Sequence, residues 1–338
     1  MHTERSGQII PYAKHMGITS FASMTAVKKA LGIKKVGHTG TLDSFADGLL
    51  VLLSDKMTRF ADIISAGKKS YEVWAEFGKQ TASLDTESPV IKTGALPSIA
   101  ALQNAFPRFT GVIEQTPPEF SAIKINGKRA SDRMRLGETV ILKPRPITIF
   151  NISTVTVITE SNGNIKYAHL KVLCSKGTYI RSLVRDIAAS IGTCGYVRAL
   201  RRTRVGTFSL ESAVGFASLP DFSALPKTWE LKKEPDAYKY SGSGFPQSLL
   251  DEIKIKSIQF TPNVAEQLEI KKIFILEQYL KDFYCGKKIK PDWFVPFPKE
   301  YMQLVPSEQI AVFSCNTCIG LLSTNMHGFK YKAVMKNT

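Results

Sequence analysis

The residues best suited to chemistry form one short loop, residues 37–43, which reads GHTGTLD. Asp43 is its only acid, and the apolar segment 49–53 that follows has the length and composition of a buried strand. Gly37 and Gly40 permit main-chain conformations that bulkier residues avoid, which suits a loop that touches a large ligand with its backbone. The loop thereby places a single carboxylate directly before a strand that is expected to be rigid. Because Asp is also common in turns, residue types alone leave a purely structural role open.

Three other stretches carry side chains that could act with this carboxylate. Residues 174–181 read CSKGTYIR and place Arg181 at the start of a predicted helix whose apolar stripe continues to Ile187. Tyr71 begins a segment that alternates as a strand does. Residues 198–204 hold four arginines. Taken separately, these features describe a core tyrosine and charged surface, so residue types do not assign them a role.

The order of these stretches resembles the TruB family of pseudouridine synthases. The segment GHTGTLDSFADGLLV resembles the family's typical GHTGTLDPLATGVLP, with Ser44 in place of the usual proline. KKSYEVWAEFGKQT resembles KxYxxxxxLGxxT, CSKGTYIRSL matches almost letter for letter, and residues 200–206 match LRRTxxG. The family's DKPxGxTS keeps its lysine and glycine, as Lys14 and Gly17, whereas TDTxDxxG survives only in part at residues 81–85. The resemblance covers roughly residues 9 to 210.

The resemblance implies three catalytic residues. Asp43 corresponds to the catalytic aspartate, Tyr71 to the tyrosine that packs against the target base, and Arg181 is expected to form the ion pair that keeps Asp43 ionised. His38 is expected to fill the gap that a flipped base leaves. The residues expected to contact RNA are Lys14, His38, Thr39, Gly40, Lys124, Lys176, Tyr179, Leu200, Arg201 and Arg202. For Lys14, an ordinary surface position and a structural or RNA-side role near the loop 37–43 are equal alternatives.

The implied reaction is isomerisation of the uridine at position 55, in the T-loop of tRNA, after base flipping. It breaks the bond between uracil N1 and the ribose, turns the base over and rejoins it through C5. The Asp43 carboxylate can act beside the glycosidic carbon, where positive character develops, or can add to the base. Tyr71 is a candidate for removing the C5 proton. Because no redox step or transfer to a second molecule occurs, we expect neither a cofactor nor a metal.

Three other functions deserve comparison with this one. A guide-dependent synthase of the archaeal and eukaryotic branch shares the same blocks but needs protein partners and a guide RNA. A non-catalytic tRNA-binding or RNA-folding protein would lose the aspartate or the arginine, and both are present. A hydrolytic nucleosidase needs a second carboxylate to activate water, for which Asp47 is the candidate.

Composition limits the classes of partner and the kind of protein that the sequence can represent. The chain has 338 residues, a 43% hydrophobic fraction and a formal charge of +16, which favours a nucleic acid as partner over an anionic membrane. We find no apolar run long enough to span a membrane and expect a soluble, cytoplasmic protein that acts alone as a monomer. Five scattered cysteines indicate reduced thiols, and the lone pair Cys315 and Cys318 is a weak signal for zinc.

The predicted fold is α+β, with a mixed and largely antiparallel central sheet flanked by helices. Residues 1–220 form the expected catalytic domain, in which residues 115–146 make a basic insertion that grips RNA through its phosphates. Residues 221–250 are expected to be a linker, because prolines and glycines are frequent there. Residues 251–338 are expected to form a small β-rich domain of PUA type, which binds RNA. Within it, the segment 264–282 has helical spacing.

Overall fold

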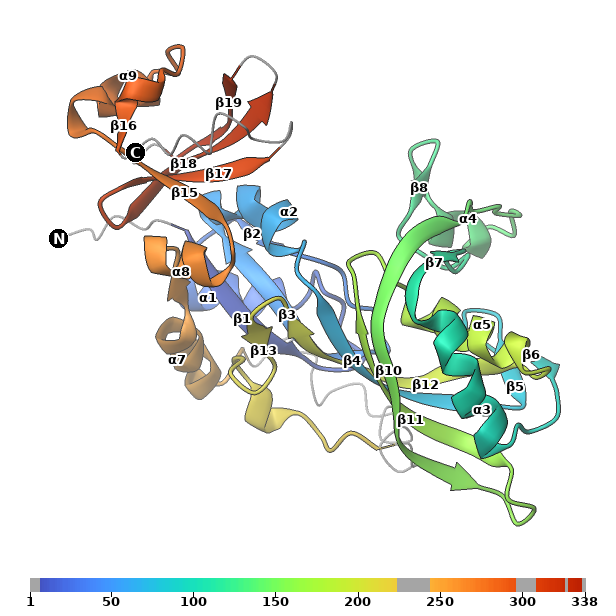
Figure 1. Cartoon of the computed structure of the whole chain (residues 1–338). Coiled ribbons are helices and arrows are strands. Elements are labelled where there is room, and N and C mark those ends of the chain that lie inside the picture. Colours follow the sequence, from blue (N-terminus) through green and yellow to red (C-terminus); the bar gives the residue numbers. More distant parts are fainter. Residues whose placement is uncertain (1–6, 224–243, 296–307, 326–327, 336–338) are drawn as a thin grey trace.

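A large mixed sheet is the centre of the structure, a computed structural model that describes residues 7–223, 244–295, 308–325 and 328–335. Its main path of strands runs in the order β14-β1-β3-β12-β4-β11-β10-β7 (Figure 1). In this order the strands are β14 (Ile258–Gln259), β1 (Gln8–Lys14), β3 (Asp47–Ser54), β12 (Gly195–Val205), β4 (Lys69–Phe77), β11 (Ile165–Cys174), β10 (Arg145–Thr159) and β7 (Gly111–Gln115). Two short strands, β2 (Val36–His38) and β13 (Phe208–Ser209), pair with β3 and β12. Only the β3–β12 pair is parallel among these described strands, which confirms a largely antiparallel sheet.

Strand β3 confirms the buried strand predicted after the active loop, since all eight of its residues are buried. Leu50 and Leu52 pack in one apolar cluster, together with helices α1 (Met24–Leu31) and α7 (Gln247–Lys256). Leu49 packs in another cluster. Gly48 permits the parallel contact with β12. Its φ is +108°, and a Cβ there would lie 2.4 Å from the carbonyl oxygen of Arg202. The parallel pairing of β3 and β12 therefore requires glycine at this position.

Strands β10 and β11 form a hairpin whose turn contains Asn162 and Gly163. They pair antiparallel, and Gly163 adopts the left-handed conformation with φ +77°. Helix α5 (Ile180–Ser190) follows β11, and its predicted apolar stripe, including Leu183 and Ile187, is buried. With α3 (Ile99–Ala105), this helix packs on strands β4, β10, β11 and β12 around the largest cluster of apolar side chains. The hairpin and α5 thus place residues 175–181 beside the sheet.

Two helices from distant parts of the chain pack together on β1 and β3. They are α1 (Met24–Leu31) and α7 (Gln247–Lys256), which share a core that includes Val27 and Ile253. Strand β14, directly after α7, extends the large sheet by pairing with β1. The predicted linker, 221–250, therefore ends inside α7, and the predicted boundary at residue 251 falls within a helix that belongs to the catalytic sheet. Most of that linker, residues 224–243, lies outside the described part of the chain.

A second, five-stranded sheet follows, in the order β16-β15-β17-β18-β19, and gives the β-rich carboxy-terminal region that was predicted. Its strands are β16 (Phe294–Val295), β15 (Lys271–Ile275), β17 (Gln309–Ser314), β18 (Thr317–Asn325) and β19 (Gly328–Val334). The helix predicted over 264–282 is wrong as one element: α8 (Pro262–Gln267) and α9 (Leu280–Tyr284) flank β15. Pairing with β16 and β17 stabilises β15 as a strand, so tertiary contacts override local spacing.

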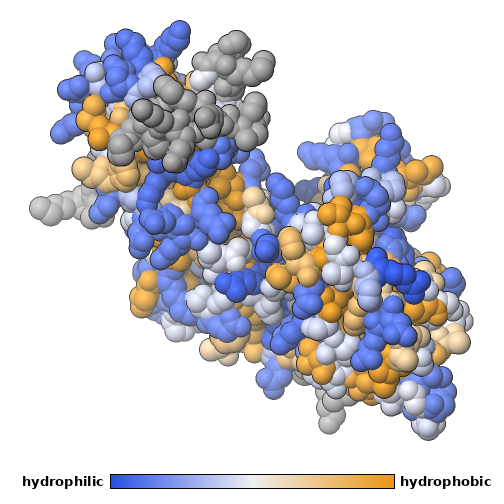
Figure 2. Space-filling model, in the orientation of Figure 1, coloured by the Kyte–Doolittle hydropathy of each residue, from blue (hydrophilic) through white to orange (hydrophobic). Residues whose placement is uncertain are grey.

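The basic insertion forms a raised part of its own. It contains the hairpin of β8 (Lys124–Ile125) and β9 (Lys128–Arg129), followed by helix α4 (Ala130–Arg135). Figure 1 shows it rising from the sheet on the same side as the carboxy-terminal region, and Figure 2 shows a broad depression between these two parts. Among the described residues, no helix is both long and apolar enough to cross a membrane.

Candidate active site

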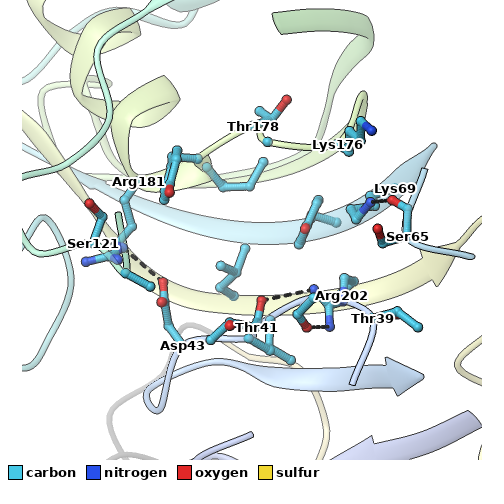
Figure 3. Close-up of a pocket in the computed structure, with 18 residues that line it drawn as sticks. Thr39, Thr41, Asp43, Ser65, Lys69, Ser121, Lys176, Thr178, Arg181 and Arg202 are labelled. Carbon is cyan, nitrogen blue, oxygen red and sulfur yellow. Dashed lines mark hydrogen bonds and ion pairs between the residues drawn. The ribbon is translucent and has the colours of Figure 1, made fainter. Parts of the chain in front are cut away.

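A cavity of about 520 Å³ opens between the predicted active loop, strands β4 and β12, and the segment before α5 (Figure 3). Asp43 and Arg181 lie at one end of it, and Lys69 lies toward the other. Tyr71 and Leu200 also line the cavity. These residues come from four separate stretches of the chain, and the sheet brings them together.

Asp43 forms an ion pair with Arg181 at the mouth of the cavity. Asp43 Oδ2 lies 3.0 Å from Arg181 Nε. The Asp43 side chain is 38% exposed, whereas the Arg181 side chain is only 6% exposed. A substrate can therefore reach the carboxylate, while the cation is held behind it in the protein. The guanidinium therefore holds the carboxylate from the protein side through a charge-assisted contact.

Arg181 is itself fixed by three further acceptors. Its Nη1 donates to Asp85 Oδ2 and to the Ser83 carbonyl, both at 2.9 Å, and its Nη2 donates to the Phe120 carbonyl at 3.0 Å. Asp85 is 2% exposed and also accepts from the Ser83 hydroxyl. Burial raises the pKa of Asp85, and the charge of Arg181 opposes this rise. The planar guanidinium thus bridges a buried carboxylate and an accessible one.

Tyr71 and Arg202 are cross-strand partners beneath the active loop. Tyr71 is buried, which raises the pKa of its hydroxyl, and Arg202 partly opposes this rise. Arg202 donates to the carbonyls of Leu49 at 2.7 Å, Gly40 at 3.2 Å and Thr41 at 3.3 Å. Although Arg202 was expected to contact RNA and does line the cavity, these hydrogen bonds tie it to the backbone of the active loop.

Lys14 supports the same loop from the protein interior. It is fully buried, and its Nζ donates to the carbonyls of Ala46 at 2.6 Å, Ile18 at 2.7 Å and His15 at 3.0 Å. This position corresponds to the structural alternative, and it removes the ammonium from the surface where RNA would contact it. Burial lowers the pKa of Lys14 to about 7, although the nearby charge of Asp47 opposes the shift.

Replacement of Lys14 by methionine is expected to change how stability depends on pH. From pH 7 to pH 10.5 the unfolded chain keeps a proton on Lys14 that the folded protein releases, so the free energy of unfolding of the wild type rises with pH. Over this range the wild type should gain about 1 kcal/mol per pH unit relative to Lys14→Met. Urea denaturation at pH 7, 8 and 9 measures the difference. Lys29→Met, at an exposed position on α1, is the control, and equal slopes for wild type and Lys14→Met would contradict the prediction.

Two family models match the chain. The model of the TruB family pseudouridylate synthase N-terminal domain covers residues 28–180, and that of the tRNA pseudouridylate synthase B C-terminal domain covers residues 181–237. The chain belongs to the TruB family.

Curated relatives extend this likeness over nearly the full chain. The chain is 51% identical to the tRNA pseudouridine synthase B of Treponema denticola, with 97% of this chain and 98% of the relative covered. It is 36% identical to the protein of the same name from Treponema pallidum, with 96% of each covered. A solved structure titled "Crystal Structure of a Cbf5-Nop10-Gar1 Complex" has a TM-score of 0.62 at 19% identity, covering 97% of this chain and 85% of that one. This structural likeness confirms the pseudouridine synthase fold.

Arg201 lies on the opposite face of β12 from the TruB cavity, because side chains alternate along a strand. Its Nε and Nη2 donate to the two oxygens of Asp47 at 2.8 and 2.7 Å. Asp47 is only 2% exposed. The RNA contact expected of Arg201 therefore has no support in this placement. The same pairing removes Asp47 as the second carboxylate of a nucleosidase.

The other predicted RNA-side residues divide into two groups. Thr39, Gly40, Lys176, Tyr179 and Leu200 line the TruB cavity. His38 is the last residue of β2 and is half-buried, and Lys124 is exposed in the insertion, so neither belongs to the cavity lining. Their predicted contacts with RNA stay predictions.

Two residues of this TruB site escaped the sequence analysis. Asp85 is the second carboxylate on Arg181, and the partial match to TDTxDxxG was the signal that could have identified it. Lys69 lies at the far end of the cavity and donates to the Ser65 carbonyl at 2.8 Å and the Gly67 carbonyl at 3.2 Å. Burial lowers the pKa of Lys69 to about 8, and the charge of Arg202 adds to the shift. Its signal was the lysine of KxYxxxxxLGxxT.

In the described part of the chain, no group of three or more His, Cys, Asp or Glu side chains is arranged to hold a metal ion. Cys315 is exposed between β17 and β18, whereas Cys318 is buried and burial raises its pKa to about 12. The thiol of Cys318 donates to the Gly320 carbonyl.

Proposed function

We propose that this protein isomerises uridine 55, in the T-loop of tRNA, to pseudouridine. The observation that carries the proposal is the Asp43–Arg181 ion pair of 3.0 Å at the mouth of a cavity lined by Tyr71. The relatives named tRNA pseudouridine synthase B support tRNA as the substrate. Position 55 and the roles of the individual residues come from the family motifs in the sequence.

In the proposed reaction Asp43 supplies the charged group that meets the substrate. The carboxylate attacks the ribose carbon of the glycosidic bond or adds to the uracil ring, and the bond to N1 breaks. The base then rotates and C5 bonds to the ribose carbon. The bond that Asp43 formed breaks and frees its carboxylate, while N1 gains a proton and C5 loses one. Arg181 pairs with the carboxylate before the attack and orients it throughout.

The cavity offers a place for a base outside the RNA stack. A uridine in a folded loop must leave its stack before its glycosidic bond is accessible, and this costs a few kcal/mol. The Tyr71 ring and Leu200 form an apolar floor on which the base can rest. His38, at the end of β2, is the proposed filler of the gap in the RNA.

The surroundings suit a large, anionic and folded partner. The depression seen in Figure 2 lies between the basic insertion and the carboxy-terminal region, and the residues facing it are largely hydrophilic. Lys124, Lys128 and Arg129 are exposed in the insertion. Such cations bind phosphates without reading sequence, which positions the T-arm while the cavity selects the uridine. We propose that the protein acts as a monomer, without a guide RNA.

The test uses purified protein and an unmodified tRNA transcript. Pseudouridines are mapped by a chemical label that stops reverse transcription, and we expect a single stop at position 55. A transcript with cytidine at that position should give no stop. Tight tRNA binding without product would overturn the proposal in favour of a guide-dependent synthase or an RNA-folding protein.

Tyr71→Phe is expected to separate packing from proton transfer. Phenylalanine keeps the ring but removes the hydroxyl, so tRNA affinity should stay within about twofold, whereas turnover should fall about a hundredfold if the hydroxyl takes part in removing the C5 proton. Single-turnover rates and filter binding measure the two quantities. Full turnover in Tyr71→Phe would leave Tyr71 as a packing residue only.

A further inference from the structure

The residue next to the catalytic aspartate makes a contact that links two loops. Ser44 Oγ donates a hydrogen bond of 2.5 Å to Glu87 Oε1, although the two residues lie 43 positions apart. Glu87 is exposed and Ser44 is partly buried, so the hydrogen bond lies at the surface beside the mouth of the cavity. A hydrogen bond to a carboxylate is stronger than one between neutral groups. The Ser44–Glu87 hydrogen bond therefore joins residues 39–46 directly to residues 82–89. Arg181 makes a second link between the same two segments by binding Asp43 and Asp85.

The loop that carries Glu87 also carries Asp85, the buried partner of Arg181. The Glu87 backbone N–H donates to Asp85 Oδ1 at 2.9 Å, while the other oxygen, Oδ2, receives the hydrogen bond from Arg181. The main chain at residue 87 is thus fixed relative to the Asp85 carboxylate. The Glu87 side chain extends this fixed point toward Ser44.

These contacts form a closed ring. Asp43 binds Arg181, Arg181 binds Asp85, Asp85 accepts from the backbone of Glu87, Glu87 accepts from Ser44, and Ser44 is bonded covalently to Asp43. We propose that Ser44 and Glu87 are positioning residues, which hold the Asp43 carboxylate in register with Arg181 by closing this ring. The proposal deepens the proposed function, since its effect on rate presupposes that Asp43 is the catalytic group.

The need for such a link follows from where Asp43 lies. Its side chain is 38% exposed and is held by one ion pair, so the loop must supply the rest of its orientation. The Ser44 carbonyl is already held by the Gly17 N–H at 2.8 Å and by Lys14 Nζ at 3.5 Å. These contacts hold the main chain of the loop from the protein interior, whereas Glu87 holds the Ser44 side chain at the surface. A small error in the direction of the carboxylate costs rate but not affinity for RNA.

The experiment compares Ser44→Ala with Ser44→Thr, and Glu87→Ala with Glu87→Gln, on the tRNA transcript. Threonine keeps the hydroxyl donor and glutamine keeps an acceptor oxygen at the same distance, so both should retain most of the single-turnover rate. Each alanine variant should lose about tenfold in rate at saturating enzyme, with the Kd for tRNA within about twofold of wild type. The double alanine variant should be no slower than the single variants by more than about twofold, because one hydrogen bond is lost in every case.

Three outcomes would overturn the positioning role. Alanine variants with wild-type rates would show that the ring is not needed, and a double variant about a hundredfold slower would show that the two residues act separately. If Glu87→Gln falls as far as Glu87→Ala, the effect belongs to the charge of Glu87 and not to its contact with Ser44.

Hydrogen exchange gives a readout that does not depend on activity. Amides of residues 40–46 should exchange faster in Ser44→Ala than in Ser44→Thr, while those of α5 stay unchanged in both. Unchanged exchange in the loop would overturn the link as a structural element. A wild type that converts no tRNA would instead refute the proposed function, and the exchange result would still decide whether the ring holds the loop.

Discussion

Asp43→Asn is expected to reduce the rate of pseudouridine formation more than about a thousandfold. Asparagine has nearly the same size and leaves the loop backbone unchanged, but it carries no charge to stabilise or attack the substrate. The side chain is partly exposed, and its one ion pair among the described residues is with Arg181, so the protein should fold and bind tRNA as the wild type does. Single-turnover conversion of the transcript and filter binding measure rate and affinity separately.

Asp62→Asn is the matched control for this substitution. The Asp62 side chain is 84% exposed and lies 3.8 Å from Lys332, in the contact between α2 (Ala61–Ile64) and the carboxy-terminal sheet. The Asp62→Asn variant should convert tRNA at the wild-type rate. Product formed by Asp43→Asn at more than about a tenth of that rate would exclude Asp43 as the catalytic group.

Arg181→Lys is expected to have the second largest effect, with a loss of about a hundredfold in rate. A single ammonium cannot bridge Asp43 and Asp85 while it also reaches the carbonyls of Ser83 and Phe120, so the catalytic carboxylate loses its fixed partner. The buried Asp85 carboxylate also loses part of the positive charge that offsets the cost of its burial. We therefore expect the free energy of unfolding to fall by about 2 kcal/mol. Rates on the transcript and urea denaturation measure the two effects.

Arg185→Lys provides the control one helical turn later. Arg185 donates to Asp186 and to the Thr116 carbonyl and makes no contact with Asp43 among the described contacts. Lysine at this position should leave the rate within about twofold of wild type. If Arg181→Lys behaved in the same way, the two-carboxylate bridge would have no part in catalysis.

Order along the chain was sufficient to predict three residues that line one cavity. Asp43, Tyr71 and Arg181 come from motifs whose spacing matches the family, and all three line one cavity. The buried strand after the active loop and the apolar face of α5 follow from periodicity, which depends only on local sequence. These features were predictable because each is encoded within a short segment.

The sequence did not show which basic residues are buried. Lys14, Arg201 and Arg202 were expected to contact RNA because they match family motifs. The structure places all three in the interior, where they bond to carbonyls or to Asp47. The sequence does not distinguish a basic residue that binds phosphate from one that supports a loop. In the second case the partner of the side chain is a group far away in the chain.

Domain limits were also beyond local sequence. Helix α7 and strand β14 pack on β1 and β3, whose residues precede them by about two hundred positions. Composition near residue 250 predicts a linker but cannot show that the next helix returns to the catalytic sheet. For the same reason β15 read as helix, because its strand partners come later in the chain.

The sequence by itself determined the family, because the family's motifs are particular side chains in a particular order. The reaction and the residues proposed to carry it follow from that resemblance. The tertiary structure decided how those side chains are held. The bridge from Arg181 to Asp85, the burial of Lys14 and the contact between Ser44 and Glu87 each join residues at least about thirty positions apart. Such contacts depend on how the sheet brings loops together, and no local pattern of residues records that arrangement.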